Sequence, residues 1–424
     1  ALLEAMRADS CRLAAAVGYR GLGTVEFVVA GGRHHFLEVN PRLQVEHPVT
    51  EAITGLDLVE LQLRIADTGR LPLAQAEVRC DGHAFEARVC AEDAAAGFLP
   101  ATGRVALARF PGPPLRVDAG VASGDAVTPH YDSMIAKLIA HAPTRTAACA
   151  LLQSGLAETR VLGVVTNLAF LQRLLALPQT RDSTFHTRLI DERFGGGGAA
   201  VLVPPEPPFG HRCAAALLWL ERERRVGSGL DLGCWTEGGT FTGWRLASSA
   251  EALPSALPSL LLKSGAHEWP VRYSRREADG SMRVAIGERT ERASLDALGG
   301  AQYLLRCDGI ALELSMHADA ARIEVAGAHG HTAFDGTPYL GGAALVAAPS
   351  GQLAAPMMGK VVAIRARAGD HVSVGQTVIV LESMKMELRV DAPFDGSVES
   401  VRCALGDMVE RAAVLAVVNP AAPN

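Results

Sequence analysis

Residues with the chemistry of an active site gather in FLEVNPRLQVEHPVTE, at positions 36–51. Glu38 and Asn40 lie two residues apart, so on an extended strand both side chains point to the same face. Glu26, on the apolar stretch before them, can join them across a hairpin. Two carboxylates and an amide oxygen on one face suit Mg²⁺ (or Mn²⁺) bound to nucleotide phosphates. The alternative interpretation is a salt-bridged hairpin face that only meets solvent.

Arg42, Gln44 and Glu46 follow at alternate positions of the same stretch, so they could converge on one ligand. An arginine guanidinium fits a planar oxyanion such as bicarbonate, and a nearby glutamate can act as a base. Pro41 and Pro48 exclude a regular central strand or helix through the stretch. We therefore expect a loop at an active site.

A second stretch, ESMKMEL at 382–388, sets Lys385 between Met384 and Met386. Methionines usually fill gaps in a core, whereas a lysine is rarely fully buried. An ordinary exposed turn lysine is the simplest interpretation. The flanking methionines, together with an internal repeat around them, favour a lysine that is presented at the surface for a function.

The internal repeat has an offset of 37 residues. APMMGKV at 355–361 matches APFDGSV at 392–398, and Gly369-Asp370 matches Gly406-Asp407 at the same offset. Glycines shared by both halves mark turns. We expect two β units that close into a small sandwich around one core, with Lys385 projecting into solvent from the connection between them.

Composition limits the class of protein. The 424 residues are 49% hydrophobic and 20% charged, as in a globular multidomain chain. A net charge of −6 gives no basic field for nucleic acid, and no apolar run is long enough to span a bilayer. The eight scattered cysteines contain no CxxC pair, which predicts neither zinc site nor disulfide framework. We therefore expect a cytoplasmic protein without nucleic-acid or membrane partners.

The chain divides into three segments at a glycine- and proline-rich stretch near 193–210 and at a softer break near 341–353. Segment one (1–195) mixes helices with a hairpin, segment two (208–345) has one strong helix followed by short alternating strands, and segment three (350–420) holds the repeat. The individual elements that we expect are an amphipathic N-terminal helix, strands at 23–30 and 34–39, and helices ending at Gly69 or spanning 146–163, 166–177 and 211–225.

Segment three resembles the biotin carboxyl carrier domain of biotin-dependent carboxylases, whose motif is Ala/Ser-Met-Lys-Met. Here the motif reads Ser383-Met384-Lys385-Met386, and APMMGKV resembles the family's Ala-Pro-Met-x-Gly start. The resemblance implies biotin joined to Lys385 by an amide, after recognition by a biotin protein ligase, with Met384 and Met386 beside the cofactor. Lipoyl domains share the duplicated fold but usually place an acidic residue before the lysine, so a lipoyl carrier is the alternative.

Segment one resembles the C-terminal part of biotin carboxylase, an ATP-grasp enzyme. The resemblance runs through QVEHPVTE, GHAFEARVCAEDAAAGFLPATGRV at 82–105 and HYDSMIAKLIAHAPTRTAA at 130–148. It implies ATP, Mg²⁺ and the substrate bicarbonate. The residues that it assigns to Mg²⁺–ATP are Glu26, Glu38 and Asn40, and those that it assigns to bicarbonate are Arg42, Gln44 and the amide of Val45.

The same resemblance gives three residues a part in the chemistry. Glu46 would deprotonate bicarbonate, and Arg88 would stabilise the biotin enolate, with Arg42 also at the family's active-site position. The family has a long region before this point, with an α/β domain and a glycine-rich lid that this sequence does not contain. We expect this chain alone not to carboxylate biotin. A non-catalytic carrier or scaffold is a second alternative.

Segment two resembles the helix-plus-barrel domain that docks acyl-CoA carboxylase α subunits onto their β subunits. GWRLASS at 243–249 resembles the GWRLN of methylcrotonyl-CoA and geranyl-CoA carboxylases. The segment is too short for a carboxyltransferase of the TIM-barrel type. The resemblance therefore implies a carboxyltransferase β subunit as partner in a large α/β hetero-oligomer, with methylcrotonyl-CoA or geranyl-CoA as substrate and propionyl- or acetyl-CoA as the alternative.

Overall fold

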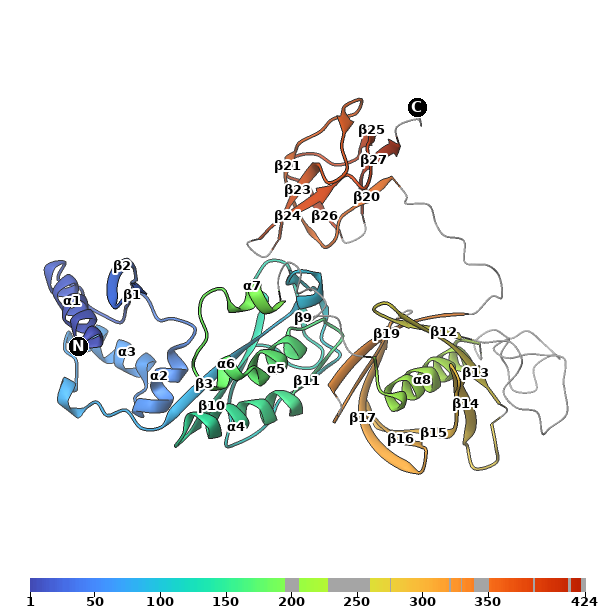
Figure 1. Cartoon of the computed structure of the whole chain (residues 1–424), viewed down its shortest axis with the longest axis horizontal. Helices are drawn as coiled ribbons and strands as arrows, with labels where there is room; N and C mark the ends of the chain where they lie inside the picture. Colours follow the sequence, from blue (N-terminus) through green and yellow to red (C-terminus); the bar gives the residue numbers. More distant parts are fainter. Residues whose placement is uncertain are drawn as a thin grey trace.

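The computed structural model describes residues 1–194, 206–227, 260–274, 276–319, 322–328, 330–338, 351–383, 386–410 and 413–420. Three regions follow one another along the chain: an N-terminal region of helices and small sheets, a barrel that encloses one helix, and an all-β C-terminal region (Figure 1). This architecture confirms the predicted multidomain α+β class. Within the described ranges, no helix combines the length and apolarity needed to cross a membrane.

The N-terminal region contains twenty short elements. They are α1 (Leu2–Ala16), β1 (Thr24–Ala30), β2 (Arg33–Asn40), α2 (His47–Thr54), α3 (Leu58–Thr68), η1 (Gln75–Glu77), β3 (His83–Cys90), β4 (Glu92–Asp93), η2 (Ala94–Ala96), β5 (Leu99–Pro100), β6 (Gly103–Arg104), β7 (Leu107–Arg109), β8 (Arg116–Ala119), β9 (Ala126–Val127), β10 (Met134–Ala142), α4 (Arg145–Glu158), β11 (Arg160–Leu162), α5 (Leu168–Ala176), α6 (Pro178–Arg181) and α7 (Leu189–Phe194).

Strands β1 and β2 form the predicted hairpin. Gly31 and Gly32 join them with positive φ at both residues, as a two-residue hairpin turn of this kind requires. The register pairs Glu26 with Glu38, and Asn40 ends β2 at the open end of the hairpin, away from the turn. The pairing therefore places the three predicted metal ligands close to one another.

A three-stranded antiparallel sheet, in the order β3-β10-β8, is the scaffold of this region. Alternate residues of β10 point to opposite faces. Leu138 is fully buried and shares a core with Leu152 and Leu156 of helix α4. Lys137 lies on the opposite face, against which helix α2 packs. The two faces therefore differ: one is apolar, and the other carries charged side chains.

The prediction of a helix over 146–163 is wrong at the C-terminal end. Helix α4 stops at Glu158, and the chain then forms strand β11, which pairs with β7. The conformation here is set by pairing with a strand that is distant in the sequence, and helical periodicity does not predict such pairing. The helix ending at Gly69 is confirmed as α3, since Gly69 has φ +70° at its C-cap.

The second region is a closed antiparallel barrel in which each strand pairs with the next and β12 closes on β19. Helix α8 runs through it, and its residues 213–219 are buried in the barrel core (Figure 1). The predicted helix and meander are thus confirmed, whereas GWRLASS lies outside the described residues. The elements are α8 (Phe209–Gly227), β12 (Leu260–Ser264), β13 (His267–Tyr273), β14 (Met282–Ile286), β15 (Arg289–Gly299), β16 (Gln302–Cys307), β17 (Ile310–Asp319), β18 (Arg322–Gly327) and β19 (Gly330–Pro338).

The barrel touches the N-terminal region through strand β11 and the residue after it. Glu324 of β18 is almost fully buried and accepts a hydrogen bond from the backbone N–H of Gly163 at 2.5 Å. Arg160 donates to the carbonyl of Gly327 at 3.1 Å. These two hydrogen bonds therefore link strand β18 of the barrel to the N-terminal region.

The third region shows the predicted repeat strand by strand. Strands β21, β22 and β23 recur 37 residues later as β25, β26 and β27, and Gly369 and Gly406 share φ +93°. The two sheets, β20-β27-β25-β22 and β24-β23-β21-β26, hold equivalent strands in the same order. The strands are β20 (Gln352–Ala354), β21 (Gly359–Ile364), β22 (His371–Val372), β23 (Thr377–Ser383), β24 (Met386–Asp391), β25 (Gly396–Val401), β26 (Met408–Val409) and β27 (Val414–Pro420).

Candidate active site and carrier hairpin

Polar side chains meet at the open end of the β1–β2 hairpin. Asn40 donates from Nδ2 to Oε1 of Glu26 at 2.7 Å and to Oε1 of Glu38 at 3.2 Å. Gln44 donates from Nε2 to the same Glu26 oxygen at 3.1 Å. The structure therefore brings the three predicted metal ligands together and adds Gln44, which the sequence resemblance assigned to bicarbonate.

The donor atoms of this cluster fit a hard cation. Two carboxylates and an amide carbonyl are the kinds of oxygen ligand that Mg²⁺ takes, usually with nucleotide phosphates and water. Among the described residues, no group of three or more His, Cys, Asp or Glu could hold a metal ion on its own. A cation here would therefore depend on phosphate or water oxygens to complete its coordination, as the predicted Mg²⁺–ATP does.

Arg42 extends the cluster along the loop that follows β2. Its Nη2 lies 3.4 Å from Oδ1 of Asn40, and its Nη1 donates to the carbonyl of Leu43 at 3.2 Å. The side chain is exposed, so an anion can reach the guanidinium. The loop turns at residues 45–46, and the three alternate residues contact different partners: Arg42 contacts Asn40, Gln44 contacts Glu26, and Glu46 contacts Arg88.

Glu46 lies at the start of helix α2, which begins at His47 with Pro48 in its first turn. This corrects the expectation that Pro48 would exclude a helix, since the first turn of a helix does not need the missing N–H. Oε2 of Glu46 accepts a hydrogen bond from Nη2 of Arg88 at 2.5 Å. Both side chains are about half exposed, at 51% and 49%. The structure thus joins two predicted catalytic residues from distant parts of the sequence.

Lys137 was missed by the sequence reasoning, although it anchors the same loop. It is the cross-strand partner of Arg88, and its Nζ donates to the carbonyl of Val45 at 3.2 Å. The ammonium also lies 3.3 Å from Oδ2 of Asp118 on β8. Lys137 therefore fixes the backbone of the predicted bicarbonate loop to the sheet. The only signal in the sequence was its position, as a lone charge within an apolar strand.

Two arginine contacts complete this charged face. Arg116 bridges Glu51 of α2, at 2.6 Å, and Asp118, at 2.9 Å. Burial alone would raise the pKa of Asp118, but hydrogen bonds from Arg116 and Lys137 outweigh it and hold that pKa below its usual value. Hydrogen bonds to Asp118 and Glu51 raise the pKa of Arg116. Helix α2, and with it Glu46, is therefore tied to the sheet by ion pairs.

Glu86 is a second residue that the sequence reasoning missed. It lies two residues before Arg88 on β3, so both side chains share one face. The side chain of Glu86 is only 4% exposed, and Nε of Arg88 lies 3.9 Å from its Oε1. Burial raises the pKa of the Glu86 carboxyl, against the attraction of Lys137 and Arg88, which lowers it.

The carrier hairpin is built from β23 and β24. Ser383 ends β23 and pairs with Met386, the first residue of β24, while Met384 and Lys385 between them lie outside the described residues. The buried hydroxyl of Ser383 donates to the carbonyl of Met358 at 2.8 Å. A Cβ on Gly359 would meet the Glu382 carbonyl at 2.9 Å, so the glycine of APMMGKV permits a close approach of the two strands.

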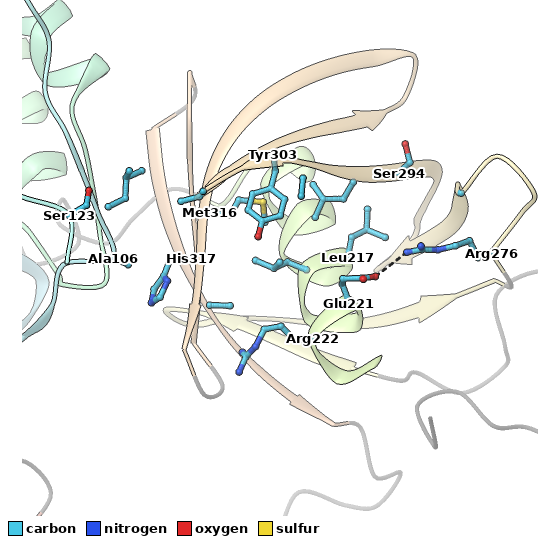
Figure 2. A pocket seen from close by; sticks show the side chains of 18 residues that line it. Ala106, Ser123, Leu217, Glu221, Arg222, Arg276, Ser294, Tyr303, Met316 and His317 are labelled. Carbon is cyan, nitrogen blue, oxygen red and sulfur yellow. Dashed lines mark hydrogen bonds and ion pairs between the residues drawn. The ribbon is translucent and has the colours of Figure 1, made fainter. Parts of the chain in front are cut away.

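One cavity of the structure is remote from these residues. It measures about 660 Å³ and lies between the mouth of the barrel and the neighbouring N-terminal region, where Ala106 and Ser123 face Tyr303 and His317 (Figure 2). None of its lining residues is a predicted site residue. The candidate active site is instead an open surface at the end of the hairpin and along the charged face of the sheet.

Comparison with known families assigns the three regions. Residues 86–192 match biotin carboxylase C-terminal domains, and residues 1–74 match the ATP-binding domain of the carbamoyl-phosphate synthase L chain. Residues 351–418 match the family described as biotin-requiring enzyme. The matches follow the order of the elements along the chain.

Individual proteins are similar to part or most of the chain. The α subunit of mouse (Mus musculus) methylcrotonoyl-CoA carboxylase is 34% identical over 95% of this chain, which spans 56% of that protein. Human (Homo sapiens) pyruvate carboxylase is 46% identical over 44% of this chain and 16% of its own length. The biotin carboxylase domain of a thermophilic 2-oxoglutarate carboxylase is 40% identical, with 42% of this chain and 41% of that chain covered and a TM-score of 0.42.

The chain spans little more than half of the length of the curated α subunits that it matches. Within that span it contains part of an ATP-grasp domain, a biotin carboxylase C-terminal domain, an eight-stranded antiparallel barrel and a biotinyl domain. The chain therefore combines domains that occur in biotin-dependent carboxylases and is similar over almost its whole length to α subunits of methylcrotonoyl-CoA carboxylase.

Proposed function

We propose that the protein acts as the α subunit of a biotin-dependent acyl-CoA carboxylase. In this proposal, ATP and bicarbonate carboxylate a biotin on Lys385, and the carboxyl group then passes to an acyl-CoA on a partner subunit. The observation that carries the proposal is the joint presence, in one chain, of the Glu46–Arg88 pair in a biotin carboxylase region and of Ser-Met-Lys-Met between two paired strands of a biotinyl domain.

The site residues divide the work by their chemistry. Glu26, Glu38 and Asn40 would hold Mg²⁺ on the phosphates of ATP, because they supply hard oxygen donors. Arg42 would bind bicarbonate together with the Val45 amide, whose loop Lys137 ties to the sheet. The contact between Gln44 and Glu26 couples that loop to the metal cluster.

Glu46 would be the base and Arg88 the cation that balances charge. An ionised carboxylate held beside a guanidinium can accept the bicarbonate proton, which makes the remaining oxyanion a stronger nucleophile. Arg88 would then face the bound biotin as a hydrogen-bond donor and a positive charge, and biotin would supply the nitrogen that carries the carboxyl group. Tethering biotin to the carrier gives a high effective concentration at both sites.

The barrel would dock a carboxyltransferase β subunit. The described barrel is filled by helix α8 and carries no predicted catalytic residue, as expected of an interaction module. Similarity to methylcrotonoyl-CoA carboxylase α subunits favours methylcrotonyl-CoA or geranyl-CoA as substrate, with propionyl- or acetyl-CoA as the alternative. A large α/β hetero-oligomer and a cytoplasmic location belong to the same proposal.

The carrier function can be tested on this chain. The protein is incubated with biotin, ATP and a biotin protein ligase, and its intact mass is measured. We expect one biotinyl group on the wild type, one on the Lys360→Arg variant and none on Lys385→Arg. Lys360 is the matched control, because it is an exposed lysine of the same domain. An unmodified wild type, or lipoyl transfer to Lys385 by a lipoyl ligase in place of biotin, would overturn the proposal.

A further inference from the structure

Glu86 is a buried acid whose surroundings do not explain its burial. Its side chain is 4% exposed, and neither carboxylate oxygen has a hydrogen-bond partner among the described residues. A buried carboxylate without donors costs stability, and a well-packed apolar side chain would serve the fold better. The position of Glu86 therefore points to a role other than holding the sheet together.

The cations that surround Glu86 are those of the candidate active site. Arg88 lies on the same strand, and its Nε is 3.9 Å from Glu86 Oε1, beyond hydrogen-bond distance. Lys137 of β10 attracts Glu86 across the sheet, and His47 does so from helix α2. Glu46 repels it. Farther along the same face, Arg116 is already engaged by two other carboxylates.

Arg88 therefore lies between two carboxylates. Its Nη2 is bonded to Glu46 at 2.5 Å, and its Nε faces Glu86 at 3.9 Å. The guanidinium has several N–H donors, so a small rotation would let it donate to Glu86 without leaving the site. A partner that is close but not bonded is what a side chain needs if it is to change partners.

We propose that Glu86 is a positioning residue that holds Arg88 in the active site when Glu46 loses its charge. The inference rests on the proposed function. When a proton passes from the hydroxyl of bicarbonate to the carboxylate of Glu46, Glu46 becomes neutral and its attraction for Arg88 weakens. Glu86 remains a second anion on the other side of the guanidinium. Arg88 would then stay oriented toward the cofactor site.

Glu86 also keeps Glu46 a useful base. Two carboxylates near one guanidinium share its charge, and each disfavours ionisation of the other. Without the negative charge of Glu86, Glu46 alone of the two carboxylates would attract Arg88. Glu46 would then accept the bicarbonate proton less readily. The loss of Glu86 should therefore change the pH dependence of the reaction as well as its rate.

The first test does not require a measurement of enzyme activity. A crystal structure of the Glu46→Gln variant places a neutral side chain where the proposal has a protonated Glu46. We expect Arg88 to turn toward Glu86, with an N–H to carboxylate oxygen distance between heavy atoms of about 3 Å. Arg88 turned into solvent, with Glu86 still unbonded, would overturn the inference. The proposed function would be untouched by that result.

The second test uses the full-length subunit and ATP-dependent carboxylation of free biotin. We expect Glu86→Gln to lower kcat about tenfold and to move the acidic limb of the pH profile downward by about one unit. Glu86→Asp keeps the negative charge, so it should displace the acidic limb less than Glu86→Gln does. Glu324→Gln is the matched control, since it removes another carboxylate that is only 3% exposed, in the barrel, and should leave the profile in place.

The outcomes separate the two proposals. An inactive wild-type subunit, with biotin on its carrier, would count against the proposed function. An active wild type and a Glu86→Gln variant with an unmoved acidic limb would overturn the positioning role, whatever the variant's kcat. Should Glu86→Gln fail to fold, the profile of Glu86→Asp decides, because a limb displaced in the same direction supports the role and an unmoved limb refutes it.

Discussion

The ion pair between Arg116 and Glu51 should decide how firmly helix α2, and with it Glu46, is held against the sheet. Arg116 donates to Glu51 at 2.6 Å, and the Glu51 side chain is only 9% exposed. Breaking a fully buried pair typically costs about 3–5 kcal/mol. Arg116 is 46% exposed, and Glu51 keeps a hydrogen bond from the backbone N–H of Leu58. For Arg116→Met we therefore expect a loss of about 2 kcal/mol.

Local hydrogen exchange can measure this loss. All four tryptophans lie at 219, 235, 244 and 269, so fluorescence would report on segment two and not on α2. A local loss of about 2 kcal/mol corresponds to roughly thirtyfold faster exchange of the amides of α2 and β8, provided that the exchange rate follows the equilibrium constant for local opening. Peptides of the biotinyl domain serve as the internal reference, and their exchange should not change.

The matched control is Arg64→Met on helix α3. Arg64 pairs with Glu60 at 2.5 Å, but both side chains are more than half exposed, so the loss should stay near 0.5 kcal/mol. In a double-mutant cycle, Glu51→Met and Arg116→Met should be clearly non-additive. Exchange of α2 that is no faster in Arg116→Met than in Arg64→Met would refute the reasoning that this pair holds Glu46 in place.

Three further predictions follow from the described contacts. Gly163→Ala should destabilise the N-terminal region by at least about 2 kcal/mol in chemical unfolding, because φ is +93° and the added Cβ would meet the Arg104 carbonyl at 2.2 Å. Since the pKa of Asp118 is lowered in the folded state, the contribution of this carboxylate to the free energy of unfolding is present above its ordinary pKa and is lost as pH falls through the lowered value. Asp118→Asn should therefore flatten that part of the stability–pH curve, as measured by unfolding at several pH values. Ser383→Ala should cost about 1 kcal/mol in thermal unfolding by removing the bond to Met358, while intact mass shows biotinylation retained.

The repeat was predictable because local chemistry repeats with it. Glycines at 369 and 406 mark the same left-handed turn in both halves, and the intervening strands are short and apolar. The hairpin before the active site was predictable for a similar reason, since Gly31-Gly32 fixes both turn and register. Counting back from the turn pairs Phe27 with Phe36 and would pair Glu26 with Leu37, whereas a bulge between Glu26 and Phe27 moves the partner to Glu38, and the sequence did not predict that bulge.

The charged face of the sheet could not be predicted in the same way. Lys137 meets Arg88 only because β10 pairs with β3 in one register, and Asp118 joins them through β8. The local sequence of these strands does not predict that pairing. Glu86 was overlooked for a further reason: alternation along β3 puts it on the face of Arg88, but only the packing of α2 shows that this face is buried.

The proposed function is tested most directly by following label from bicarbonate to the carrier. The full-length, biotinylated subunit is incubated with ATP, Mg²⁺ and radiolabelled bicarbonate, and label bound to the biotinyl domain is counted. We expect label on the wild type, none on Lys385→Arg, and almost none on Glu46→Gln although that variant still carries biotin. Label on Lys385→Arg, undiminished label on Glu46→Gln, or an unlabelled biotinylated wild type would refute the proposed function.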